Sequence, residues 1–308
     1  GAASMTVAVG SMSDPIQLFG MAHFLEHMLF LGTEKYPEEG SYQKFVSTHD
    51  GFSNAYTADD RTNYHFEIDP DYLEEGLDRF SQFFLSPLFN QELIKRELKA
   101  VNSEHSKNIP NDFRRIRQVK RKAFEENHPA RNFATGTLET LADVTREELL
   151  DFYNRHYSSN RMMLAIAGPQ DLDNLQQLVV PRFASVKNLN LNQIRFSSKY
   201  MNSDTRFRLM RVKTIKDTRS LTLMFALPKT LHYYKSQPLG MLGFLLGHEG
   251  KGSLLSLLKR KNLATGLSAG GGESNNSFSS FEVKIQLTSK GLRNYKKIIQ
   301  NVFQYLSL

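Results

Sequence analysis

The sequence predicts an α+β fold organised as two successive units. In both halves of the chain, groups of helical patterns lie between β-type runs, as in folds whose sheets and helices form separate layers. A polar stretch rich in Asn and Ser, residues 186–204, has no clear helical period and separates the halves. We therefore predict a first domain at residues 1–185, a linker at 186–204 and a second domain at 205–308.

The elements of the first unit follow from apolar periodicity and from turn and capping residues. Thr145 and Glu148 form a capping-box pattern at the start of one helix, and Gly168-Pro169 ends a strand. The polar sequence Asp59-Asp60-Arg61 joins two β-type runs as a turn. The expected strands lie at 5–12, 53–58, 62–69 and 162–167, and the expected helices at 19–31, 39–48, 71–85, 91–107, 112–127, 146–157 and 172–183.

The second unit repeats this theme after the linker. Its β-type and helical runs follow one another in an order that echoes the first unit. The expected strands lie near 208–212, 221–227, 263–269 and 277–287, and the expected helices near 233–247, near 253–261 and from 292 onward.

Composition excludes several classes of protein. The chain has 308 residues, of which 40% are hydrophobic and 23% charged, as in ordinary soluble globular proteins. It has no apolar run of about 18 residues and no secretory signal pattern, so we expect a cytoplasmic protein that does not bind membranes. The absence of cysteine excludes disulfides and thiolate metal sites.

The net charge of +7 raises the alternative of nucleic-acid binding. The densest basic cluster, residues 114–122, is interleaved with apolar residues at helical spacing, which indicates a helix with a solvated basic face. No signature of a nucleic-acid-binding module accompanies the cluster, so we expect no nucleic-acid partner.

The sequence His23-Phe24-Leu25-Glu26-His27 predicts a metal site on a helix. Two histidines four residues apart share one helical face, and Glu26 projects beside them. The order His-x-x-Glu-His is the inverse of the zincin motif. The flanking residues are apolar nearly all round, so the helix is expected to be buried. Ordinary packing of the histidines is the alternative, but buried polar groups need partners, and a metal satisfies all three at once.

A second helical run carries Glu97 and Glu104, seven residues apart and hence on one face. One of them can complete the site as a ligand while the other accepts a hydrogen bond from a ligand histidine, and the spacing does not choose between them. A solvated acidic face is the alternative. Zinc held by two His and one Glu keeps a fourth position for water and lowers the pKa of that water, and a nearby carboxylate can then take its proton. The implied reaction is peptide-bond hydrolysis.

Residues 20–37 resemble the signature of the pitrilysin family of inverzincins, in its insulin-degrading-enzyme and nardilysin branch. Similar segments continue at 53–57, 61–64, 96–105, 157–162 and 246–256. The resemblance implies repeated homologous α+β domains, each with a mostly antiparallel sheet packed on helices. It also implies one zinc ion per chain held by His23, His27 and Glu104, with Glu26 as the general base and Glu97 as the carboxylate that supports a ligand histidine.

Substrate-binding residues are likewise implied by the resemblance. The strand that pairs with the substrate backbone corresponds to Ser53, Asn54, Ala55 and Tyr56. An extended edge can hold a peptide by strand addition with little dependence on its side chains. In the second domain, which has no metal motif, ordinary turn and cap chemistry is the alternative for the glycines. The implied site for a peptide's N-terminus consists of Gly247, His248, Gly250, Gly270, Gly271 and Gly272.

Together these patterns predict a zinc-dependent metalloendopeptidase, an insulinase-like hydrolase that degrades peptides. Members of this branch are long chains whose two halves close around the peptide, and Leu308 falls inside an expected helix. We therefore expect an N-terminal catalytic half with an incomplete second domain, which needs a C-terminal half as a partner for full activity. A non-catalytic peptide-binding or scaffold subunit of the same fold is the alternative.

Overall fold

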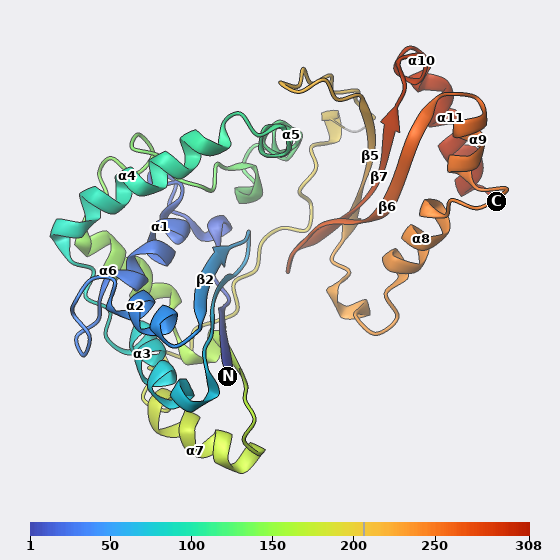
Figure 1. Cartoon of the computed structure of the whole chain (residues 1–308). Coiled ribbons are helices and arrows are strands. Elements are labelled where there is room, and N and C mark those ends of the chain that lie inside the picture. Colours follow the sequence, from blue (N-terminus) through green and yellow to red (C-terminus); the bar gives the residue numbers. More distant parts are fainter. Residues whose placement is uncertain (206) are drawn as a thin grey trace. The chain divides into compact units, whose positions relative to one another are not determined.

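The computed structural model describes residues 1–205 and 207–308 and divides them into two compact units (Figure 1). The first unit consists of Gly1–Arg121 and Pro129–Ile194, and the second of Lys122–His128 and Arg195–Leu308. The domain boundaries expected from sequence stay a prediction. Residues 122–128 belong to the second unit, although the residues before and after them in the sequence belong to the first.

The first unit contains a four-stranded sheet in which every pair of neighbouring strands is antiparallel. The strand order is β2-β3-β1-β4, so β2 lies at one edge and pairs only with β3 among the described strands. The strands are β1 (Ala2–Val7), β2 (Phe52–Thr57), β3 (Thr62–Glu67) and β4 (Met162–Ala167).

The strand expected at 5–12 was placed too late in the sequence. β1 ends at Val7 because the chain then turns toward the β2–β3 loop, where the backbone N–H groups of Ser11 and Met12 donate to the carbonyls of Ala58 and Asp59. By contrast, the strand expected at 162–167 is confirmed with the same bounds.

The helices of the first unit follow the expected periodicity closely. The capping box of Thr145 and Glu148 is confirmed, and α1 contacts both α4 and β2 (Figure 1). The helices are α1 (Met21–Met28), α2 (Ser41–Thr48), α3 (Leu73–Leu85), α4 (Gln91–Asn108), α5 (Asp112–Arg121), α6 (Arg146–His156) and α7 (Leu172–Phe183).

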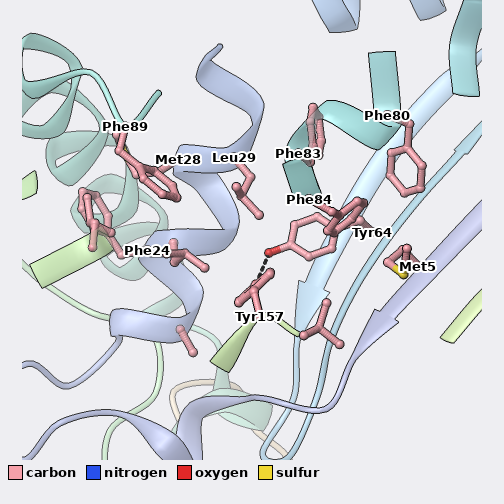
Figure 2. Close-up of a cluster of buried hydrophobic side chains, with 14 of the residues drawn as sticks. Met5, Phe24, Met28, Leu29, Tyr64, Phe80, Phe83, Phe84, Phe89 and Tyr157 are labelled. Atoms are coloured by element: carbon pink, nitrogen blue, oxygen red, sulfur yellow. Dashed lines mark hydrogen bonds between the residues drawn. The ribbon is translucent and has the colours of Figure 1, made fainter. Parts of the chain in front are cut away.

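The core of the first unit is rich in aromatic side chains. Figure 2 shows Phe80, Phe83 and Phe84 of α3 grouped around Tyr64 of β3. The Tyr64 and Tyr157 hydroxyls form a hydrogen bond of 2.6 Å inside this core, so both polar tips are satisfied (Figure 2). The core thereby fixes α3 and the sheet that carries β2.

The helix expected at 112–127 ends early, at Arg121. Residues beyond it pair with the second unit instead: Phe124 forms a β-bridge with Met201, and the backbone N–H of Glu125 donates to Tyr200 O at 2.8 Å. Tertiary pairing has therefore overridden helical propensity in this segment.

The second unit has a three-stranded antiparallel sheet of order β5-β7-β6. Side chains of β6, β7, α8, α9 and α11 contribute to its core. The strands are β5 (Ser220–Pro228), β6 (Ala264–Ser274) and β7 (Phe278–Leu287), and the helices are α8 (Pro238–Gly247), α9 (Leu254–Arg260), α10 (Ser289–Arg293) and α11 (Tyr295–Leu306).

The strand expected near 208–212 is wrong, since the structure places no strand in the described stretch 207–219. Side chains at 208–212 are all exposed, so this run has neither a packed face nor a pairing partner to stabilise it as a strand. Across 1–205 and 207–308, no helix is both long enough and apolar enough to cross a bilayer.

Candidate metal centre

The start of α1 is fixed by contacts from outside the helix. Asp14 accepts hydrogen bonds from the backbone N–H groups of Gly20 at 2.7 Å and Ala22 at 2.8 Å, which satisfies donors that lack a partner within the helix. Gly20 has φ +97°, and a Cβ there would lie 2.3 Å from the Cα of Gly136. Only glycine therefore fits where this loop passes the start of the helix.

Each histidine of the motif has one ring nitrogen held by an acceptor. Nδ1 of His23 lies 2.7 Å from Thr135 O, and Nδ1 of His27 lies 2.8 Å from Oε1 of Glu97. Because a carbonyl and a carboxylate can only accept, each Nδ1 carries the hydrogen, and Nε2 is left as the coordinating atom. The two rings lie edge to face with centroids 4.7 Å apart, so both Nε2 atoms serve one site.

Glu104 is the carboxylate that reaches this site. Its Oε2 lies 3.4 Å from Nε2 of His23 and 3.7 Å from Nε2 of His27. In a tetrahedral site with zinc–ligand distances of about 2.0–2.1 Å, neighbouring ligand atoms lie roughly 3.3–3.4 Å apart. The nitrogen and oxygen donors and their separations therefore fit a zinc ion, and these three residues could hold one.

The ionisation of these side chains reflects the same contacts. Burial lowers the pKa of His27, but its ion pairs with Glu104 and Glu97 outweigh burial and raise the pKa to about 9. Burial and the nearby His27 lower the pKa of His23. The nearby His27 lowers the pKa of Glu104, and burial acts in the opposite direction. A protonated His27 thus lies between two carboxylates, and a divalent cation would take the place of the proton on Nε2.

Glu26 lies in α1 and is only 6% exposed. Burial raises its pKa to about 7, while a hydrogen bond from Thr57 acts in the opposite direction. Thr57 Oγ1 donates to Oε2 of Glu26 at 2.5 Å. A carboxylate whose pKa is near neutrality can both take and return a proton, as a general base and acid require.

The four residues from Ser53 to Tyr56 lie in β2, the edge strand of the first sheet. Exposure alternates along this strand, and Phe52 and Tyr56 are about half exposed. One edge of β2 pairs with β3 in a regular register from Phe52↔Glu67 to Thr57↔Thr62. The other edge has no strand partner in the part of the chain that the structure describes. The strand ends at Thr57, which contacts Glu26.

Comparison with known proteins decides the family. The family model described as "Insulinase (Peptidase family M16)" matches residues 1–127, and that described as "Peptidase M16 inactive domain" matches residues 143–308. The chain belongs to the insulinase family of peptidases. The pitrilysin-type resemblance seen in the sequence is thereby confirmed.

Individual members of the insulinase family match the whole chain. It is 44% identical to "Insulin-degrading enzyme-like 1, peroxisomal" of Arabidopsis thaliana over 100% of this chain and 32% of that protein. It is 43% identical to the insulin-degrading enzyme of Homo sapiens over 99% of this chain and 30% of that protein. The crystal structure of pitrilysin superposes on 99% of this chain and 33% of its own, with a TM-score of 0.92 and 28% identity. The α+β fold is confirmed, and the chain spans about a third of the length of these relatives.

In this insulinase-family chain, the glycines expected to bind a peptide's N-terminus lie in the second unit. Gly247 ends α8, His248 follows as its C-cap, and Gly270 to Gly272 lie in β6, an edge strand of the second sheet. A Cβ added at Gly270 or Gly271 would meet no atom within 4 Å, so the backbone there faces open space. The structure thus gives β6 an open stretch, and the role of these glycines stays a prediction.

Three parts of the candidate site were not expected from the sequence. They are the carbonyl of Thr135, the close passage of Gly20 and Gly136, and the hydroxyl of Thr57. Only Thr57 offered a signal, since it ends the segment that resembles the family's substrate-binding strand. A backbone carbonyl has no signature in an amino-acid sequence.

Proposed function

We propose that this chain is the zinc-binding, catalytic part of an endopeptidase. The observation that carries the proposal is the convergence of Nε2 of His23, Nε2 of His27 and Oε2 of Glu104. Membership of a peptidase family supports it, as does a buried glutamate beside the histidines. Zinc fits this set because two imidazoles and one carboxylate are typical ligands of catalytic zinc.

Each residue has a distinct role in the proposed reaction. His23, His27 and Glu104 would hold one zinc ion, which when bound would act as a Lewis acid toward a water and the scissile carbonyl. Glu26 takes a proton from the attacking water and returns it to the leaving amine. Glu97 holds His27 in the tautomer that presents Nε2.

The edge of β2 is the proposed grip on the substrate. Main-chain pairing along Ser53 to Tyr56 recognises any extended peptide, so the specificity for side chains would be broad. We also propose that the segment around Gly247, His248, Gly250 and Gly270–Gly272 anchors the peptide's N-terminus. Because the chain spans about a third of its relatives, we propose that a complementary C-terminal part is needed for full activity. A cytoplasmic location stays a prediction.

Zinc analysis and peptide turnover, measured on the same samples, test the proposal. We expect about one equivalent of zinc per chain and cleavage of a fluorogenic peptide that a chelator abolishes, tested with and without a C-terminal part added in trans. Glu26→Gln should keep the zinc and lose the cleavage. Glu75→Gln, at an exposed position of α3, is the matched control and should change neither.

Two results would overturn the proposal. One is a purified chain that binds no zinc, and the other is cleavage that survives Glu26→Gln. A chain that binds zinc and peptide but cleaves no peptide, either with or without the C-terminal part, would favour the alternative, a non-catalytic peptide-binding or scaffold subunit.

A further inference from the structure

We propose that Thr57 is a positioning residue that orients Glu26 and leaves Oε1 of Glu26 as its proton-accepting atom. The inference rests on the proposed peptidase function. It starts from a single contact, the 2.5 Å hydrogen bond from Thr57 Oγ1 to Oε2 of Glu26, which joins the end of β2 to α1.

The hydrogen of Thr57 has one destination. The neighbouring hydroxyl, Thr62 Oγ1, lies 3.4 Å from Thr57 Oγ1 and itself donates to Val9 O at 2.9 Å. A hydroxyl has one hydrogen to donate, so that of Thr62 is used by the Val9 carbonyl. Of the two acceptors near Thr57 Oγ1, Oε2 of Glu26 is the nearer, at 2.5 Å against 3.4 Å for Thr62 Oγ1, so Thr57 gives its hydrogen to Glu26.

Burial makes this contact hard to replace. Glu26 is 6% exposed and Thr62 is fully buried, so the side of Glu26 that faces the sheet is shielded from water. Without the hydroxyl, Oε2 would lose its donor in a place where an unpaired charged oxygen is costly. The carboxylate would then rotate to find another partner, because its terminal torsion is soft.

The hydrogen bond to one oxygen of Glu26 determines which oxygen can accept a proton. Oε2 accepts from Thr57, and Oε1 has no hydrogen-bond partner among the described residues. A carboxylate held at one oxygen presents the second in a constant direction, which a base needs in order to meet the proton of an attacking water.

Thr57 also joins the base to the strand proposed to bind substrate. It is the last residue of β2 and pairs with Thr62 of β3, while the opposite edge of β2 is the one proposed to receive the peptide. The backbone that grips the peptide therefore also carries the hydroxyl that aims the base. This arrangement fixes the distance between the bound main chain and Glu26.

Substitutions at Thr57 test the inference. Thr57→Val keeps the shape of the side chain and removes the donor, whereas Thr57→Ser keeps the donor. In whichever form of the protein shows cleavage that depends on Glu26, we expect Thr57→Val to lower kcat by about 10- to 100-fold. KM and zinc content should stay unchanged, and Thr57→Ser should restore kcat to within about threefold of wild type. Thr57→Ala provides a second variant without the donor in case the valine disturbs folding.

The matched control is Thr48→Val. The hydroxyl of Thr48 is exposed and donates to Lys44 O within α2, away from Glu26, so kcat should not change. The zinc content of every variant reports on the metal centre separately from activity.

Several outcomes would overturn the inference. They are a kcat of Thr57→Val within threefold of wild type, a kcat of Thr57→Ser as low as that of Thr57→Val, and loss of zinc in both variants that lack the donor. Any of these, with wild-type cleavage intact, leaves the peptidase proposal standing. Wild-type protein without cleavage that depends on Glu26 removes both.

Discussion

Replacing Glu97 by Ala should weaken zinc binding without abolishing it. Oε1 of Glu97 lies 2.8 Å from Nδ1 of His27, and only 14% of the Glu97 side chain is exposed. Removing this acceptor frees the His27 ring to rotate and to exchange tautomers, so Nε2 is no longer held toward Glu104. Loss of such a supporting partner typically weakens metal affinity about 10- to 100-fold, or ~1.4–2.8 kcal/mol.

A graded series of variants makes the expectation specific. Glu97→Gln keeps an oxygen acceptor without the charge, so its loss of affinity should fall at the lower end of that range. Glu104→Ala removes a ligand and should lose far more than Glu97→Ala. Glu92→Ala, at an exposed position of the same helix, is the control and should bind zinc as the wild type does. Competition with a chromophoric chelator at neutral pH measures the zinc affinity of the wild type and of these four variants.

The refuting results are equally specific. Wild-type affinity in Glu97→Ala would mean that the hydrogen bond to His27 does not support the metal. Complete loss in Glu97→Ala together with retention in Glu104→Ala would mean that the two glutamates have the opposite roles.

Three further predictions concern packing and protonation. Gly20→Ala would place a Cβ 2.3 Å from the Cα of Gly136 and so displace the loop that holds His23. A zinc titration should therefore show weaker binding than in the wild type, and an unchanged zinc affinity would contradict this. Burial lowers the pKa of His156 to about 4, so the unfolded chain takes up a proton near pH 6.5 that the folded chain resists, and stability falls as the pH drops through this range. Between pH 7.5 and pH 5 the loss is at most ~2 kcal/mol, less to the extent that solvent reaches this half-buried ring. Urea unfolding at these two pH values should show a smaller loss in His156→Gln. Phe80→Ala, at a side chain 1% exposed, should cost about 3–5 kcal/mol in the same assay, and a cost below 1 kcal/mol would be inconsistent with its place in the core.

The sequence predicted that the two histidines lie together because the geometry of the motif is local. Residues four apart on a helix share a face whatever the rest of the protein does, so His23 and His27 were bound to converge once α1 formed. The roles of Glu97 and Glu104 were harder to assign, because both residues lie on one face of α4. They differ only in their distance from the histidines along the helix. That distance is set by the packing of α1 on α4, which no local pattern encodes.

The failures in the fold have the same origin. The helix expected to reach residue 127 ends at Arg121 because the next residues pair with Tyr200 and Met201, far along the chain. The run at 208–212 has one β-branched residue, Val212, and no face to bury, so it forms no strand. In both places the prediction from the local pattern was wrong, because a long-range contact, or the lack of a packed face, decided the structure.

Three polar side chains of the buried helix α1 are held in the same way, each by a partner that is distant in the sequence. His23, Glu26 and His27 each have one polar atom held by a partner from elsewhere in the sequence: a carbonyl at 135, a hydroxyl at 57 and a carboxylate at 97, respectively. Burying polar groups requires such partners, and each partner also fixes which atom of the side chain stays available. The contacts that make a buried α1 tolerable therefore also leave two nitrogens and one oxygen directed for use. In the proposed peptidase, stability and function therefore depend on the same three hydrogen bonds.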